Sequence, residues 1–80
     1  MTVEEKKAKY DIIKRGAYAD YVVINRHTSF QPFVACWAFD DETYSWGQGH
    51  YFDTEADALN HLYHKEMEVL QAVIEEYEQL

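Results

Sequence analysis

At residues 33–39 the chain reads Phe-Val-Ala-Cys-Trp-Ala-Phe, seven apolar residues in succession. Successive side chains of a β-strand point to opposite faces of the sheet, so a strand made of these residues is apolar on both faces. Such a strand belongs in the interior of a sheet that is covered on both sides. Residues 33–39 are therefore predicted to form the central strand of a small sheet.

Two further strands are expected beside it. Residues 21–26 are rich in β-branched and aromatic side chains, which fit a pleated and half-buried surface. Residues 44–52 follow an acidic turn at 40–43 and form the third strand. Connections this short join antiparallel neighbours, and Pro32 lies in a connection, outside any ladder. The expected sheet is a three-stranded antiparallel meander.

Two interpretations remain open for the third strand. Alternation places Trp46 and His50 on one face and Gly47, Gly49 and Tyr51 on the other. The two glycines leave a shallow channel that a flat ligand or the backbone of a partner can enter. Alternatively, the missing side chains make room for a large ring across the strand, or for a bulge.

A long helix is predicted for residues 55–80. Thr54 followed three residues later by Asp57 is a capping signature. At about 1.5 Å per residue the helix is roughly 38 Å long, whereas a strand of about eight residues spans only some 27 Å. Its last turns are therefore expected to overhang the sheet. The apolar residues at helical spacing are Leu59, Leu62, Tyr63, Met67, Leu70, Val73, Ile74 and Tyr77.

Glu66 falls inside this apolar stripe when the helix is projected at 100° per residue. A carboxylate there needs a partner, because burying an unpaired charge is costly. One interpretation is an ion pair or hydrogen bond at the sheet margin, for instance with Arg26 or a tyrosine hydroxyl. The other is a contact with a second subunit or a partner protein.

A first helix is predicted for residues 3–15. Thr2 and Glu5 form a capping box, and Gly16 is expected to end the helix in a left-handed conformation. The apolar residues of this segment do not gather into one arc, so residues 10–15 are alternatively a strand. The fold class is thus α+β, with a helix, three strands and a long helix in one domain over residues 1–80.

Composition narrows the class of protein further. A single cysteine rules out an intrachain disulfide framework, and no leader or long apolar run marks export or membrane insertion. The expected compartment is the cytoplasm.

The histidines and the cysteine are not expected to form a reactive site. His61 and His64 project onto the polar face of the long helix, and Cys36 on the central strand is expected to be a small buried residue. Without a nucleophile elbow or a phosphate loop, we expect no catalysis, no cofactor and no metal.

Charge is distributed unevenly along the chain. Residues 1–16 hold five basic and three acidic residues, whereas residues 17–80 hold twelve carboxylates against Arg26 and Lys65. The second segment therefore carries −10. Such a surface repels nucleic acid and membrane headgroups and favours cationic partners. We expect no direct binding of nucleic acid or membrane.

The residues expected to bind a protein partner are of two kinds. One is a set of carboxylates, at the turn and along the exposed side of the long helix, and the other is a set of aromatic anchors on the third strand. The carboxylates are Asp40, Asp41, Glu42, Asp57, Glu68 and Glu75, and the anchors are Trp46 and Tyr51, with Tyr44 beside them.

The layout of helix, three-stranded meander and long acidic helix resembles the small acidic inhibitors of phages and mobile elements. The best known are anti-CRISPR and antirestriction proteins that act as nucleic-acid mimics. The resemblance covers the whole chain in architecture and charge, and it implies a DNA mimic that occupies the basic surface of a nucleic-acid-binding complex. The alternative is a structural or regulatory homodimer joined through the long helix, whose acidity serves solubility.

Overall fold

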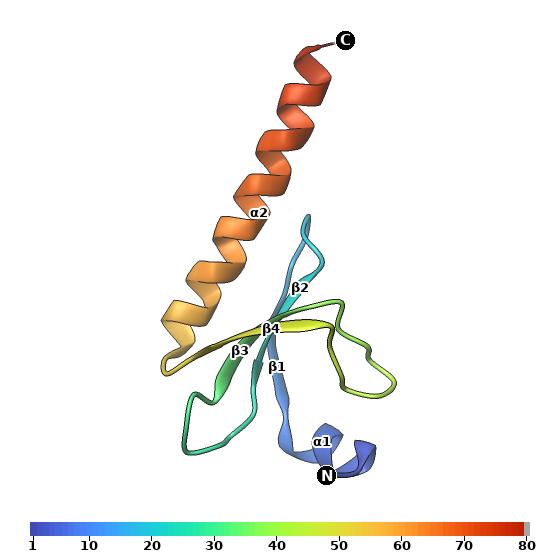
Figure 1. Ribbon diagram of the computed structural model, residues 1–80, viewed down its shortest axis with the longest axis vertical. Helices are drawn as coiled ribbons and strands as arrows, with labels where there is room; N and C mark the ends of the chain where they lie inside the picture. The colour runs from blue at the N-terminus through green and yellow to red at the C-terminus, as the bar shows by residue number, and fades with distance from the viewer. Residues whose placement is uncertain (80) are drawn as a thin grey trace.

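Two helices and four antiparallel strands make up residues 1–79, the part of the chain that the computed structural model describes (Figure 1). The fold is α+β, as predicted, and a long C-terminal helix crosses the sheet and extends beyond it. The elements in chain order are α1 (Val3–Lys9), β1 (Asp11–Arg15), β2 (Tyr21–Asn25), β3 (Phe33–Trp37), β4 (Gln48–Phe52) and α2 (Glu55–Glu78).

The strands follow one another across the sheet in the order β1-β2-β3-β4. In the two inner strands Val22 stands opposite Cys36 and Ile24 opposite Val34. All three middle residues of β3 are fully buried. The interior position predicted for residues 33–39 is therefore confirmed, although the strand ends at Trp37.

The prediction of three strands and of a first helix over residues 3–15 is wrong. The helix α1 ends at Lys9, and the segment that follows is an edge strand paired with β2. A strand places Ile12 and Ile13 on opposite faces of the sheet, where each packs against a buried cluster. One helix face could not bury both together with Tyr10, so the alternative strand is the one that forms.

Gly16 does not adopt the left-handed conformation expected of it, since no glycine of the described chain has a positive φ. Its role is to allow close approach of other atoms. A Cβ atom at this position would lie 2.5 Å from the carbonyl oxygen of Ala19 and 2.9 Å from Oε1 of Glu66. The connection between β1 and β2 is therefore too crowded for a side chain here.

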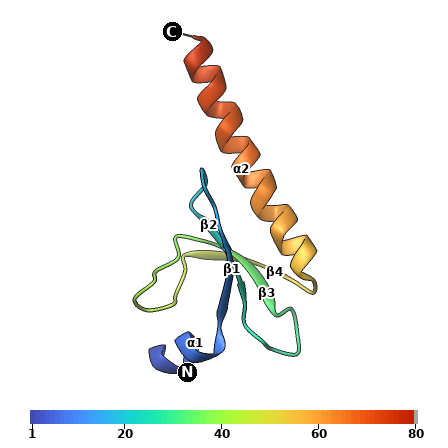
Figure 2. The ribbon, with the colours of Figure 1, turned by 180° about the vertical axis from the view of Figure 1, so that it is seen from behind.

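The sheet has a buried cluster on each face. On the helix face, Val23 and Ala35 pack against Ala58 and Leu62 of α2. On the opposite face, which we call the loop face, the cluster is covered by side chains from outside the inner strands. These are Tyr10, Ile12, Phe39 and Trp46. Figures 1 and 2 show α2 and the 38–47 loop on opposite sides of the sheet.

The 38–47 loop replaces the first half of the strand predicted for residues 44–52. The backbone turns at Ala38 (φ 58°) and Tyr44 (φ 54°), and a bridge between Asp40 and Ser45 closes the loop. The turn at Ala38 folds the loop back and brings Phe39 and Trp46 over the loop face. Trp46 thus lies on the face opposite to the one that strand alternation predicts.

Gly49 makes room for the Trp46 ring. A Cβ atom on Gly49 would lie 2.8 Å from Nε1 of Trp46 and 3.2 Å from the hydroxyl of Tyr51. The indole N–H donates to that hydroxyl over 3.3 Å. Of the two interpretations of the glycines, room for a large ring is the one confirmed.

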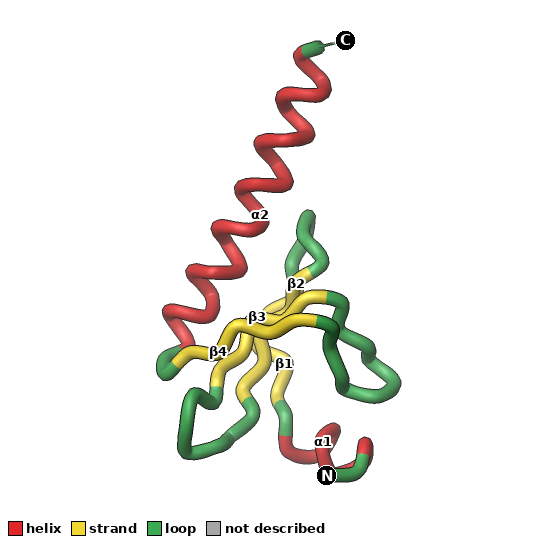
Figure 3. The backbone as a smooth tube through the Cα atoms, in the orientation of Figure 1, coloured by secondary structure: helices red, strands yellow, loops and turns green. Residues whose placement is uncertain are grey.

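The second half of α2 projects past the sheet, as predicted (Figure 3). Thr54 caps the helix by accepting the Asp57 N–H over 3.2 Å, and the buried residues Ala58 and Leu62 lie in its first half. Farther along, Val73 is 55% exposed and Tyr77 77% exposed. Within residues 1–79, α2 is long but too polar to cross a membrane, and no other helix is long enough.

Glu66 stands where α2 leaves the sheet. Its carboxylate accepts the backbone N–H groups of Ala17 (2.5 Å) and Tyr18 (2.8 Å) in the connection between β1 and β2. The expected hydrogen bond at the sheet margin is confirmed, with backbone donors in place of Arg26 or a tyrosine hydroxyl. Glu66 therefore ties the β1–β2 connection to α2.

We expect the substitution Glu66→Ala to lower the free energy of unfolding by about 1–2 kcal/mol, because two charge-assisted hydrogen bonds are lost from a half-buried site. Thermal unfolding followed by circular dichroism measures the effect. The matched control is Glu76→Ala on the exposed part of α2, with an expected change below about 0.5 kcal/mol. Equal stability of the two variants would contradict the role assigned to Glu66.

Candidate partner-binding surfaces

The structure separates the residues predicted to bind a partner into three groups. Asp40, Asp41 and Glu42 lie in the 38–47 loop, and Trp46 and Tyr51 lie on the loop face. The carboxylates of the third group, Asp57, Glu68 and Glu75, lie on α2, which covers the other face. The eight residues therefore form no single surface.

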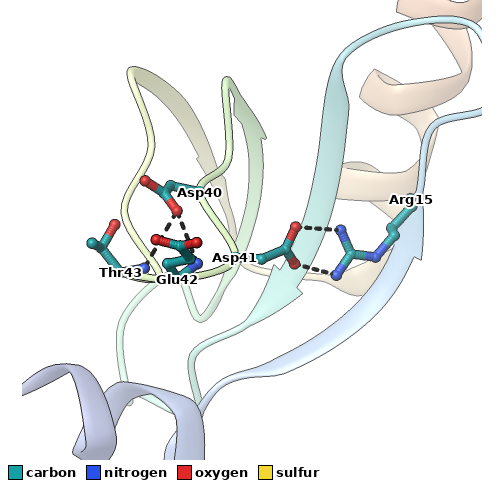
Figure 4. A network of polar contacts seen from close by, with 5 residues as sticks. All are labelled: Arg15, Asp40, Asp41, Glu42 and Thr43. Atoms are coloured by element: carbon teal, nitrogen blue, oxygen red, sulfur yellow. Dashed lines mark hydrogen bonds and ion pairs between the residues drawn. The ribbon is translucent and has the colours of Figure 1, made fainter.

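Two of the loop carboxylates have partners within the fold (Figure 4). Asp40 Oδ1 accepts the N–H groups of Glu42 (2.8 Å) and Thr43 (3.4 Å), an arrangement that stabilises the turn. Both carboxylate oxygens of Asp41 contact the Arg15 guanidinium, at 2.5 and 3.4 Å. Glu42 remains exposed. The tip of the loop thus presents less free negative charge than its sequence suggests.

The α2 carboxylates share one side of the helix. Asp57 and Glu68 are eleven residues apart and Glu68 and Glu75 seven, so all three project within about 20° of one direction at 100° per residue. They line two adjoining hollows that share His64 and Glu68. We call this shallow, open strip of surface the acidic groove, and side chains of α2 alone line its C-terminal half. Its other lining residues are Phe52, Asn60, His61, Lys65, Met67, Gln71 and Ala72.

The charges of the acidic groove remain in contact with water. Glu68 has a side chain 68% exposed, and its ion pair with Lys65 is long, at 3.5 Å. Such an exposed pair contributes little, so Lys65 compensates the charge only in part. Glu75 accepts a hydrogen bond from Gln71 over 3.2 Å, and the last turn of α2 contains no basic residue. The groove is therefore anionic along its length.

The aromatic candidates lie away from this groove. Trp46 is half-buried against the loop face, and Tyr51 is 41% exposed. The Arg26 guanidinium carbon lies 4.7 Å from the centroid of the Tyr51 ring, a cation–π distance. Trp46 packs against the buried cluster of the loop face, so only part of its ring is available to contact a partner.

His61 is not on the solvated face of the helix, and that prediction is wrong. Its ring centroid lies 4.3 Å from that of His50 and within 6 Å of Phe52 and Tyr21, because α2 crosses the sheet at an angle that brings this side chain against β4. Nε2 of His61 is buried and has no hydrogen-bond partner among the described residues. Burial, and then the neighbouring His50 and Lys65, lower the pKa of His61.

Cys36 is fully buried, as predicted for a small core residue. Its thiol donates to the carbonyl oxygen of Val22 over 3.3 Å, and burial raises the pKa of the thiol to about 12. Within residues 1–79, no three histidine, cysteine or acidic side chains are grouped closely enough to hold a metal ion.

Comparison with known proteins adds no relative to this description. No family model matches the chain, and no curated protein or solved structure is significantly similar to it.

The sequence prediction missed two residues of the groove that donate hydrogen bonds to its carboxylates, Lys65 and Gln71. Their spacings of three and four residues from Glu68 and Glu75 are the signal that identifies them.

We expect the stability of the protein to fall as the pH drops from about 7 to about 5.5. The ordinary pKa of histidine is about 6.5, and that of His61 is lower in the folded state, so the unfolded chain takes up the proton first. His50 on β4 and His64, Lys65 and Glu68 on α2 surround it, with Tyr21 of β2. Urea unfolding at the two pH values measures the loss.

The substitution His61→Phe keeps a ring against Phe52 and removes the titrating group. This variant is expected to lose less stability between the two pH values than the wild type. The matched control is His64→Gln on the exposed side of α2, which is expected to retain the dependence of the wild type. Identical pH dependence in the wild type and His61→Phe would show that another group is responsible.

Proposed function

We propose that this protein is a non-enzymatic interaction protein whose acidic groove binds a cationic site on a partner protein. The observation that carries the proposal is the alignment of Asp57, Glu68 and Glu75 along one side of α2. The proposed partner is a nucleic-acid-binding complex, and the proposed effect is inhibition of that complex by a DNA mimic. This is the mode of action of the anti-CRISPR-like proteins that the layout resembles.

The geometry of α2 supports this mode. Its carboxylates are spaced about 16 Å and about 10 Å apart along the axis, on a helix that holds them rigidly. A basic channel that grips a nucleic-acid strand meets several phosphates over such distances, because duplex DNA carries one charge per about 1.7 Å of axis. The three carboxylates are much sparser than the phosphates of DNA, and each offers one point of negative charge along such a channel to a lysine or arginine side chain.

The charge balance supports a protein partner in preference to a nucleic acid. The chain has a formal net charge of −8, and residues 17–80 contain two basic residues. Affinity for DNA or RNA without sequence preference rests on phosphate neutralisation by lysine and arginine, and the groove contains only one such residue, Lys65, which is paired with Glu68. Electrostatic attraction between the groove and a basic surface accelerates their encounter and weakens as salt rises.

Reversal of charge in the groove is expected to weaken binding strongly. The triple variant Asp57→Lys, Glu68→Lys and Glu75→Lys should weaken binding to a partner captured from host extract by roughly one to two orders of magnitude. Affinity and association rate are measured at several salt concentrations, and circular dichroism checks the fold because Asp57 lies in the capped first turn.

The matched control reverses three exposed carboxylates outside the groove, Glu42, Glu76 and Glu78, and changes the net charge equally. It is expected to bind more tightly than the groove variant. Equal weakening in both variants would mean that net charge alone attracts the partner. Affinity unchanged by the groove reversal and constant between low and high salt would leave the groove a solubilising surface.

A second candidate function is a structural or regulatory homodimer. The observation that favours it is the exposure of Met67 (65%), Val73 (55%), Ile74 (49%) and Tyr77 (77%) on the turns of α2 that overhang the sheet. Val73 and Tyr77 continue the stripe that packs on the sheet through Ala58 and Leu62. A second copy of α2 would cover this strip.

Sedimentation separates the two candidates. A homodimer joined through this strip is expected to dissociate when Val73 and Ile74 are replaced by glutamate, and the control substitution Glu76→Gln should leave it intact. A wild-type chain that sediments as a monomer at all concentrations tested would remove the dimer from consideration.

A further inference from the structure

A cleft of about 240 Å³ lies on the loop face, away from the acidic groove. Three separate parts of the chain build it: the α1 segment, the residue after β2 and the 38–47 loop. Its lining combines cations, hydroxyl groups and aromatic rings. The lining residues are Lys6, Tyr10, Arg26, Tyr44, Ser45 and Trp46.

The cleft collects positive charge in an acidic protein. Lys6 and Arg26 both line it, and no carboxylate does. The ion pairs among residues 1–79 join Arg15 to Asp41, His27 to Asp11 and Lys65 to Glu68, so neither lining cation has a carboxylate partner there. Lys7 adds a third cation beside the cleft, with Nζ 5.9 Å from the centroid of the Tyr44 ring.

Arg26 is held in place before any ligand arrives. Its Nη2 group donates to the carbonyl oxygen of Gln31 over 2.7 Å, and its guanidinium stacks 4.7 Å from the Tyr51 ring. Its Nε–H is buried and has no acceptor among the described residues. The contacts with Gln31 and Tyr51 fix the guanidinium beside the cleft, so little conformational entropy is lost there when an anion binds.

Aromatic rings form one wall of the cleft. The Tyr10 and Trp46 rings pack against each other, with centroids 6.3 Å apart and planes tilted by 42°, and Tyr44 adds a third ring to the lining. The volume is below the range of about 300–1,000 Å³ that holds drug-sized ligands, so the cleft has room for a ligand of about one ring. Aromatic walls bind such a ring through apolar contact and stacking.

We infer that this cleft binds a small aromatic oxyanion, a carboxylate or phosphate group attached to one ring. Lys6 and Arg26 neutralise the oxyanion, and the rings of Tyr10, Tyr44 and Trp46 contact the planar part. None of the three loop carboxylates lines the cleft: Asp41 is paired with Arg15, Asp40 accepts backbone N–H groups within the turn, and Glu42 is exposed to solvent. Charges on distant parts of α2 are screened within about 8 Å at physiological salt.

Titration followed by ¹H–¹⁵N NMR tests the inference with four probes: benzoate, phenyl phosphate, inorganic phosphate and neutral benzyl alcohol. Benzoate or phenyl phosphate is expected to shift the Trp46 indole signal and the Ser45 amide signal in a saturable manner. Inorganic phosphate is expected to bind roughly fivefold or more weakly than phenyl phosphate, because it lacks the ring. Benzyl alcohol is expected to cause no saturable shift.

The substitution Lys6→Met retains the length of the side chain and should weaken binding of the aromatic anions roughly fivefold or more. The matched control is Lys65→Met on the helix face, which removes the same charge and should leave the affinity unchanged. Arg26→Lys, which retains the charge, tests whether the fixed guanidinium is required, and we expect weaker binding. Equal affinity in the wild type and Lys6→Met, or equal shifts with benzyl alcohol, would overturn the inference.

Discussion

The contact between the Glu66 carboxylate and the N–H groups of Ala17 and Tyr18 ties α2 to the sheet at the point where the helix leaves it. Below this contact the apolar side of the helix packs on β2 and β3, and above it the helix has no sheet to cover. A carboxylate within an apolar stripe is tolerated because two backbone donors satisfy it. The contact therefore holds α2 at the point where it leaves the sheet, and the buried residues Ala58 and Leu62 hold its first half.

Both faces of the sheet are covered, but in different ways. The helix face is covered by one regular element, whereas the loop face is covered by single side chains from α1, β1 and the 38–47 loop. Covering a face with irregular chain brings Lys6 and Arg26 beside Tyr44 and Trp46. The two proposed binding surfaces thus lie on opposite sides of the sheet and bear opposite charge, so one can be altered without the other.

The sequence predicted the structural features that depend on residues close together in the chain. The interior strand at residues 33–37, the caps at Thr2 and Thr54 and the overhanging helix all follow from periodicity and capping chemistry. The grouping of Asp57, Glu68 and Glu75 follows from helical spacing alone. Contacts between distant parts of the chain could not be predicted in this way. Glu66 binds backbone N–H groups, which every residue type except proline has, so the sequence does not identify them. Arg15 and Asp41 form an ion pair although they are 26 residues apart. The reversal of Trp46 depends on a positive φ at Ala38, a residue that seldom adopts it.

The most direct test of the Glu66 contact is amide hydrogen exchange at Ala17 and Tyr18. Both lie in a connection whose residues are largely exposed, so without the contact their amides should exchange as fast as those of a free loop. If the contact contributes about 1–2 kcal/mol, both amides should be protected roughly tenfold, and the protection should be lost in Glu66→Ala and retained in Glu76→Ala. Fast exchange at both positions in the wild-type protein would contradict it, because α2 would then be held by its apolar contacts alone.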